Sequence, residues 1–292
     1  PMAVEVLRST CFRNQRAYII GRIRTNDGMI PLVLPLVNNT GRIQMDGPLL
    51  DQEIISEYIL TTSQSPFMAD IKRYSPSAVA GFLQSLAPDK DEIVLYECLG
   101  LSVLSHTALQ MHIREGLQKS GTKFQRTKGI RGMVMATFTL SDEDDYVYKI
   151  ACDADPAAVQ KEGYSMSGGP AKVIRKYREV REGERAGALL DSWQFDYMTF
   201  RRGDFEPEVL EEILNRAKGN VIEQGEYIIL RNLLAERKRT PLDVFYQETE
   251  DPALREKATL AFGWALTIHV RLGCSIHDFL PKNFGVSRGM RV

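Results

Sequence analysis

The stretch that decides the fold is Gly129-Ile-Arg-Gly-Met-Val-Met-Ala-Thr-Phe-Thr-Leu140, a loop with two glycines that runs into β-prone residues. The acidic turn Ser141-Asp-Glu-Asp-Asp145 follows, and then a second predicted strand, Tyr146-Val-Tyr-Lys-Ile150. Glycines let backbone N–H groups approach phosphate oxygens closely. Two glycines before a strand more often form an ordinary turn, so the loop alone does not predict a phosphate site.

Lys149 lies on the second of these strands, after the glycine loop and the hairpin. A lysine at a strand end is most often a solvated edge residue. The same order of loop, strand, hairpin and lysine is also the arrangement that places an ammonium group over the α- and β-phosphates of ATP in kinase folds. Tyr146 and Tyr148 alternate with Val147 and Lys149, which leaves one strand face for a nucleotide cleft.

A third feature lies near the end of the chain, in Ile276-His-Asp-Phe-Leu-Pro-Lys-Asn283. Asp278 and Asn283 have the D-x-x-x-x-N spacing of a kinase catalytic loop. The carboxylate can accept the proton of an attacking hydroxyl, and the amide oxygen can ligate Mg²⁺. Lys282 adds a cation for the transferring phosphoryl group. This spacing is common by chance, and it gains weight because a long predicted helix precedes it.

The remaining elements follow from hydrophobic periodicity and turn signals. Strands are expected over residues 16–24, 29–37, 41–47 and 227–230. Helices are expected over residues 77–86, 88–98, 105–117, 170–190, 207–218 and 252–270. Trp193 and Trp264 are expected in the core rather than in a site.

Composition excludes several classes of protein. The 292 residues include 37 basic and 38 acidic side chains, a net charge of −1, which argues against a protein that coats nucleic acid. No apolar run approaches the length of a membrane span, so no membrane association is predicted. The four cysteines lack C-x-x-C spacing and are expected to be reduced thiols; the four histidines do not form a zinc motif.

The two ends of the sequence suggest a fragment. The chain starts at Pro1 rather than Met, and Gly285-Val-Ser-Arg-Gly-Met-Arg-Val292 reads as a strand, a turn and the start of another strand. A domain rarely ends within a hairpin, because the strand would lack its partner. We therefore expect a fragment that is open at one or both ends.

Over nearly its whole length the chain resembles the bacterial isocitrate dehydrogenase kinase/phosphatase family. The stretches that carry the resemblance are Phe12-Arg-Asn, Ala17-Tyr-Ile-Ile-Gly-Arg-Ile23, Gly129-Ile-Arg-Gly-Met-Val-Met135, Phe138-Thr-Leu140, Glu236-Arg-Lys-Arg-Thr-Pro-Leu242 and Lys282-Asn-Phe-Gly-Val286. The resemblance implies an α+β fold. Residues 1–121 would be the end of a helix-rich regulatory domain, and residues 122–292 a protein-kinase-like N-lobe with the start of a C-lobe.

The resemblance also implies a function. The protein would be a cytoplasmic, ATP-dependent serine protein kinase and phosphatase that acts on isocitrate dehydrogenase. It would control flux between the tricarboxylic acid cycle and the glyoxylate bypass, using Mg²⁺ or Mn²⁺, with AMP or another metabolite as effector and a homodimer as one assembly. The alternative is a diverged kinase-like module that binds nucleotide or a partner without phosphoryl transfer.

Site residues follow from the resemblance position by position. The active-site aspartate matches Asp191, the catalytic-loop aspartate Asp278 and the metal-binding asparagine Asn283, with Lys282 beside it. The implied ATP-binding residues are Thr127, Lys128, Gly129, Ile130, Arg131, Gly132, Met133 and Lys149, with Leu234, Ala235 and Glu236 as the hinge near adenine. The glutamate that pairs with Lys149 is left open among Glu179, Glu182 and Glu184. The chain departs from the family pattern at Ser102–Thr107, Gly183–Gly187 and Cys152. It also stops before the family's metal-binding aspartate, so the resemblance implies that these 292 residues lack one metal ligand and most of the C-lobe. We therefore expect them to be inactive in phosphoryl transfer on their own.

Overall fold

The computed structural model describes residues 3–13, 16–62, 67, 74–127, 134–153, 169–183, 191–271, 279–287 and 292. The chain forms two compact units, of which the first comprises residues 1–110 and 184–191 and the second residues 111–183 and 192–292. Both contain antiparallel sheets and helices, so the fold is α+β as expected. Within the described ranges, we find no helix that is both long and apolar enough to cross a membrane.

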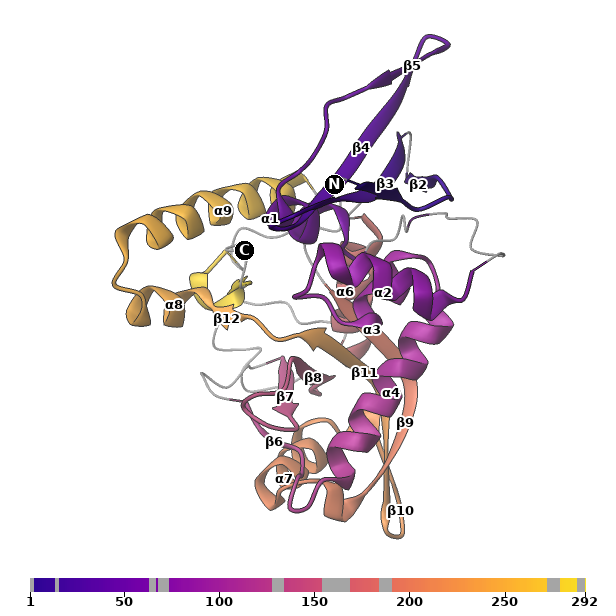
Figure 1. Ribbon diagram of the computed structural model, residues 1–292. Helices are drawn as coiled ribbons and strands as arrows, with labels where there is room; N and C mark the ends of the chain where they lie inside the picture. The colour runs from indigo at the N-terminus through magenta and orange to yellow at the C-terminus, as the bar shows by residue number, and fades with distance from the viewer. Residues whose placement is uncertain are drawn as a thin grey trace. The chain divides into compact units, whose positions relative to one another are not determined.

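The first unit contains an antiparallel sheet. Its strands are β1 (Ala3–Val6), β2 (Cys11–Arg13), β3 (Arg16–Thr25), β4 (Gly28–Asn39) and β5 (Arg42–Met45). The order is β1-β3-β4-β5, with β2 also paired to β3, and Figure 1 shows β4 and β5 as a long hairpin. The predicted strands at 16–24, 29–37 and 41–47 are confirmed, whereas β1 and β2 were not expected. Gly28 closes the tight turn with a φ of 150°, which favours glycine.

Four helices follow the sheet in the chain: α1 (Gln52–Ile54), which continues as a π-helical turn over Ile55–Ile59, then α2 (Pro76–Leu86), α3 (Glu92–Cys98) and α4 (Ser102–Gln118). Ser75 caps α2 by accepting a hydrogen bond from Ala78 N at 3.1 Å, and Asp91 caps α3 in the same way. Sheet residues such as Ile20 and helix residues such as Leu83 share one buried core. The three helices predicted between residues 77 and 117 are therefore confirmed.

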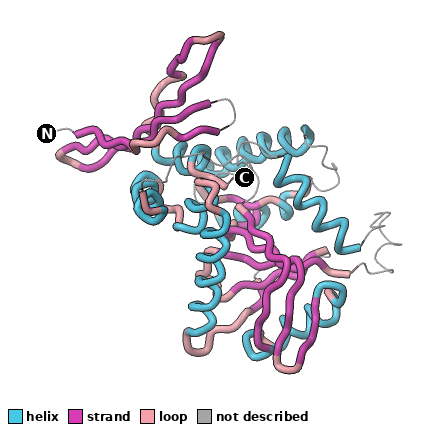
Figure 2. Tube along the Cα trace, turned by 90° about the vertical axis from the view of Figure 1, so that its right-hand side faces the viewer, coloured by secondary structure: helices cyan, strands magenta, loops and turns pink. Residues whose placement is uncertain are grey.

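The second unit is organised around a six-stranded antiparallel sheet (Figure 2). Its strands are β6 (Gln125–Arg126), β7 (Met135–Thr139), β8 (Tyr146–Ala151), β9 (Ser192–Arg201), β10 (Val221–Gln224) and β11 (Tyr227–Arg237). The order is β10-β11-β8-β7-β6, and β9 pairs with the other edge of β11. The short strand expected at 227–230 is instead the longest strand of this sheet, and β9 was not predicted.

One face of this sheet carries a cluster of aromatic side chains. The ring of Phe124 lies 5.0–5.4 Å from the rings of Phe138, Tyr148, Phe200 and Phe205. Trp193 is fully buried and packs edge-to-face on Tyr146 at 5.6 Å, as expected for a core residue. The same expectation for Trp264 is wrong, because its side chain on α9 (Pro252–Arg271) is 66% exposed.

Asn232 allows both halves of β11 to contribute to the aromatic core. Its φ of 51° lies in the left-handed region, which asparagine tolerates better than most residues. Before it, Ile228 and Leu230 are buried; after it, Leu233 and Ala235 are buried, and so are Leu234 and Glu236 on the opposite face. The residues of β11 that face the aromatic core therefore change from even to odd positions at Asn232, as a local change of pleat would produce.

Helices connect and follow the strands of this sheet in the chain. α6 (Gly169–Gly183) lies between β8 and β9 in the chain, α7 (Pro207–Arg216) between β9 and β10, and α8 (Leu242–Glu248) and α9 follow β11. The predicted helix at 170–190 is confirmed as far as Gly183. The strand β13 (Gly285–Val286) pairs with β12 (Thr240–Pro241), so its partner precedes it by more than 40 residues. Residues 288–291, which carry the rest of the expected hairpin, lie outside the described residues.

Candidate functional site

Lys149 lies on β8, where its register partners are Thr137 on β7 and Leu234 on β11. Its Nζ atom donates a hydrogen bond to Glu236 Oε2 at 2.5 Å. Glu236 pairs across the strands with Val147, which places it diagonally from Lys149 on the same face of the sheet. The two side chains are only 22% and 10% exposed, so most of the ion pair is removed from water.

The charge of Lys149 is stabilised by this carboxylate. Burial on its own would lower the pKa of the lysine, but the negative charge of Glu236 outweighs burial and raises the pKa above its usual value. Tyr177 on α6 lies within reach of both charges. Lys149 acts to lower the pKa of this phenol, while burial and Glu236 raise it further than Lys149 lowers it. Lys149 is therefore a cation, and Tyr177 a neutral hydroxyl, throughout the physiological pH range.

Among the described residues, the carboxylate that pairs with Lys149 is Glu236, which was not one of the candidates. Glu179 on α6 forms an ion pair with Arg175 at 3.5 Å, one turn earlier on the same helix. The side chains of Glu182 and Glu184 lie outside the described part of the chain. Glu236 could be recognised only from the strand register, since 87 positions separate it from Lys149.

The sheet face around Lys149 differs sharply from the aromatic face. Next to it, Thr127 and Thr137 place their hydroxyl oxygens 2.7 Å apart. On this same face, α6 covers a neighbouring part of the sheet. Its residues Val173 and Ile174 pack there against apolar strand residues: Met135, Ala151 and Leu234. Lys149 is thus a cation at the border between a hydroxyl-bearing strand edge and a helix-covered apolar patch. Of the predicted glycine loop, residues 128–133 lie outside the described residues.

The three predicted hinge residues lie within β11, between β8 and β9. Leu234 faces the same side as Lys149, Ala235 is fully buried on the opposite side, and Glu236 holds Lys149. Glu236 Oε1 is buried and accepts no hydrogen bond from any described residue, so one acceptor of this carboxylate is unused within that part of the protein. Their role in nucleotide binding remains a prediction.

The catalytic-loop residues are described only in part. Asp278 lies outside the described residues, whereas Lys282 and Asn283 belong to an exposed 3-10 turn over Pro281–Asn283. The amide oxygen of Asn283 is chemically suited to Mg²⁺, which prefers oxygen ligands. Among the described residues, no three His, Cys, Asp or Glu side chains gather as a metal site would require. The chemistry of Asn283 therefore fits the ion.

Asp191 belongs to the first unit, although the next residue begins β9 of the second. It is 8% exposed. Its Oδ1 atom accepts a hydrogen bond from the hydroxyl of Thr62 at 2.7 Å and another from the Thr62 backbone N–H at 3.3 Å. Sequence analysis identified Asp191 by resemblance but gave no signal for Thr62, because 129 positions separate them.

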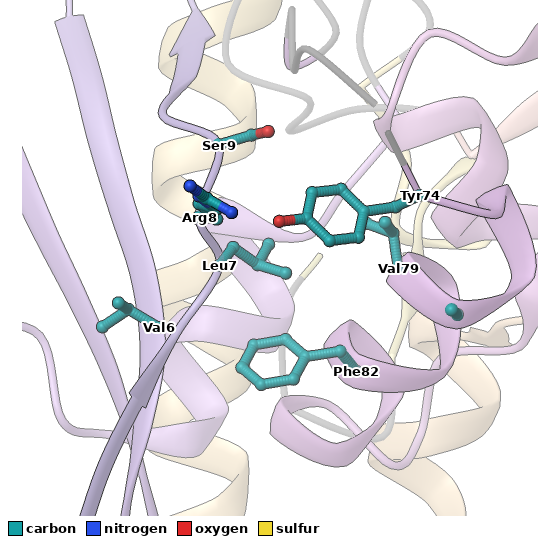
Figure 3. A pocket seen from close by; sticks show the side chains of 8 residues that line it. Val6, Leu7, Arg8, Ser9, Tyr74, Val79 and Phe82 are labelled. Atoms are coloured by element: carbon teal, nitrogen blue, oxygen red, sulfur yellow. The ribbon is translucent and has the colours of Figure 1, made fainter. Parts of the chain in front are cut away.

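The first unit also contains a cavity of about 220 Å³ between β1 and α2. Figure 3 shows Arg8 and Tyr74 pointing toward one another, and Leu7, Val79 and Phe82 also line the cavity. None of the predicted site residues lines this cavity among those described.

Comparison with known proteins shows the family of this chain. Residues 122–292 match the family model of the isocitrate dehydrogenase kinase/phosphatase (AceK) kinase domain, and residues 1–121 match that of the regulatory domain. Among curated proteins, isocitrate dehydrogenase kinase/phosphatase of Bordetella parapertussis is 33% identical over 99% of this chain and 46% of that protein. The enzyme of the same name from Anaeromyxobacter sp. is also 33% identical, over 99% of this chain and 48% of that protein. The chain spans about half the length of the curated relatives it matches. The chain belongs to the isocitrate dehydrogenase kinase/phosphatase family.

Proposed function

We propose that this chain is part of a bifunctional enzyme that transfers the γ-phosphoryl group of ATP to a serine of isocitrate dehydrogenase and also hydrolyses the phosphoserine. The observation that carries the proposal is the Lys149–Glu236 ion pair on a sheet face that carries threonine hydroxyls and is partly covered by α6. In kinase folds, a strand lysine after a glycine loop contacts the ATP phosphates. Family membership supports the same reading.

Lys149 would bind the α- and β-phosphates. An ammonium group has three donors, so it can keep its bond to Glu236 and still donate to phosphate oxygens. Because its pKa is raised, no proton has to be gained before the nucleotide binds. Fixing the cation before binding reduces the reorganisation needed during phosphoryl transfer.

The remaining roles are assigned from chemistry and position in the chain. Asp278 would accept the proton of the serine hydroxyl, and Lys282 would offset charge on the transferring group. Mg²⁺ or Mn²⁺, when bound with Asn283 as one ligand, would neutralise charge on the phosphates. Asp191 would act as the active-site carboxylate implied by the family.

We also propose the wider setting. Residues 1–121 would form the end of the regulatory domain and residues 122–292 the start of the catalytic domain. Isocitrate dehydrogenase, the substrate in the name of the relatives, would be the protein substrate, with AMP or another metabolite as effector. Because that substrate is a metabolic enzyme, we assign the reaction to the cytoplasm.

The test uses the full-length protein with purified isocitrate dehydrogenase and ATP labelled at the γ-phosphate. We expect labelling by the natural protein and at least about a 100-fold loss in Lys149→Met and in Asp278→Ala, the size of effect typical of a lost charge stabiliser or general base. Lys149→Arg, which keeps the charge but not the compact ammonium, serves as the intermediate control. Unchanged labelling in either variant would remove the role assigned to that residue. ATP binding by the natural protein without any labelling would favour the non-catalytic module instead.

A further inference from the structure

Asp191 is held by a residue far from it in the chain. We propose that Thr62 is a positioning residue for Asp191 and that it fixes the carboxylate in the orientation that the phosphate chemistry needs. The inference rests on the proposed function, because it assumes the active-site role of Asp191. It goes further by assigning a role to a side chain from the segment that precedes α2.

Two hydrogen bonds from Thr62 converge on one carboxylate oxygen of Asp191. The Thr62 hydroxyl and backbone N–H both donate to Oδ1 of Asp191, at 2.7 and 3.3 Å. Both residues are buried, with Thr62 only 5% exposed. Hydrogen bonds to an ionised acceptor are stronger than those between neutral groups, and water competes little at a buried site. A β-branched side chain also has restricted χ1 freedom, so its hydroxyl direction is well defined.

The backbone next to Thr62 is itself anchored by a buried arginine. Arg13 on β2 donates from Nη1 to the Ile59 carbonyl at 3.0 Å and from Nη2 to the Thr61 carbonyl at 3.4 Å. Its guanidinium also lies 3.9 Å from the ring centroid of Phe67. Arg13 therefore holds the backbone just before Thr62, and this fixes the position from which the Thr62 hydroxyl reaches Asp191.

Arg13 and Asp191 both act electrostatically on the same thiol, that of Cys98. Burial is the main cause of the raised pKa of this thiol, while the Arg13 cation lowers it and the Asp191 carboxylate raises it. Arg13 Nη2 lies 3.5 Å from Cys98 Sγ. The Arg13 cation and the Asp191 carboxylate therefore both lie close enough to Cys98 to act on its thiol.

The neighbouring Thr61 provides a matched control. It is fully buried as well, but its hydroxyl has no hydrogen-bond partner within the described residues. Thr61→Val and Thr62→Val therefore remove the same atom from adjacent buried positions, and only the second removes a bond to Asp191. A purely structural role for Thr62 would give the two changes different Tm values and similar kcat values, so a loss of kcat in Thr62→Val alone is assigned to the bond with Asp191.

The experiment compares Thr62→Val, Thr62→Ser and Thr61→Val in the full-length protein. For each variant, kcat and KM are measured for phosphorylation and for dephosphorylation of isocitrate dehydrogenase, together with Tm. We expect Thr62→Val to lower kcat of at least one reaction by about tenfold or more with KM little changed, since a bond to a charged group is lost. Thr62→Ser keeps the hydroxyl and should retain most of the rate, and Thr61→Val should resemble the natural protein.

Three results would overturn the inference: equal rate losses in Thr62→Val and Thr61→Val, no rate loss in Thr62→Val, or no rescue by serine. If Thr62→Val does not fold, Thr62→Ala takes its place. Asp191→Asn separates this inference from the proposed function. If Asp191→Asn keeps full activity, the role of Asp191 is wrong and the inference falls with it. If Asp191→Asn is impaired, adding Thr62→Val to it should reduce kcat no further, and a further drop would show that Thr62 acts elsewhere.

Discussion

The two faces of the sheet in the second unit use alternate residues of the same strands for different purposes. On one face, Tyr146, Tyr148 and Trp193 are fully buried among other aromatic rings. On the other, Lys149 and Glu236 form an ion pair beside two threonine hydroxyls. A one-residue shift of register would exchange the two sets. Aromatic packing therefore also fixes where the cation lies.

The faces should respond differently to substitution. Aromatic side chains stabilise by burial and dispersion, so each truncation leaves a cavity. An ion pair contributes little net stability. Replacing only one of its residues nevertheless destabilises the protein, because the other charge is then buried without a partner. The aromatic face should thus determine stability, and the polar face should show pairwise effects that a second substitution can cancel.

The largest effect is expected at Trp193. Trp193→Ala should lower the free energy of unfolding by about 3–5 kcal/mol, because a fully buried indole is lost from the core. Trp264 is the control within the same chain: its exposed side chain predicts a change below about 0.5 kcal/mol for Trp264→Ala. Urea denaturation of both variants gives the two values. Similar losses in the two would contradict the assignment of Trp193 to the core of this sheet.

The next effect concerns the ion pair. Lys149→Met should destabilise by about 2 kcal/mol, since it leaves Glu236 buried without its cation; partial exposure keeps the value below that of a fully buried pair. The double variant Lys149→Met with Glu236→Leu should recover most of this loss. Denaturation midpoints of the single and double variants measure the coupling. Additive losses would mean that the two residues do not form a pair in solution.

These two sites show what sequence could predict. The alternation of Tyr146 and Tyr148 with Lys149 depends on neighbouring residues in one strand, so periodicity revealed both faces. The partner Glu236 depends on which strand lies beside β8 and in which register, and no local pattern contains that information. Thr62 beside Asp191 is a similar long-range pairing. Trp264 was misplaced because the size of an indole predicts burial whether or not its helix face meets a core.

β9 was missed for a related reason. Its residues Trp193 and Phe195 suit a strand, but Asp196 and the exposed Tyr197 interrupt simple alternation. Opposite them, Asn232 in β11 has a left-handed φ. A change of parity in two paired strands at one level removes the period-two signal that sequence analysis relies on. The irregular backbone at Asn232, which lets both halves of β11 pack on the aromatic core, also explains why β9 was not predicted from the sequence.

Asn232 allows this idea to be tested with a smaller expected effect. Asn232→Gly and Asn232→Ala both lose the side-chain contacts to Asn220 and Gln194, at 3.3 and 3.4 Å. Only alanine is also strained at a φ of 51°. Asn232→Ala should therefore be less stable than Asn232→Gly by about 1 kcal/mol, as measured by urea denaturation. Equal stability of the two variants would show that β11 does not adopt this conformation.

The smallest effect is expected at the threonine pair beside Lys149. The hydroxyls of Thr127 and Thr137 lie 2.7 Å apart, and both side chains are partly buried. Thr137→Val should cost about 0.5–1 kcal/mol, because it leaves the Thr127 hydroxyl without this partner, and Thr127→Val should cost a similar amount. The variant with both changes should be no less stable than either single one, since no hydroxyl is then stranded. A double-mutant cycle from denaturation midpoints measures this coupling. If the losses add instead, the hydroxyls act independently, and this part of the polar face is solvated rather than built from pairs as Lys149 and Glu236 are.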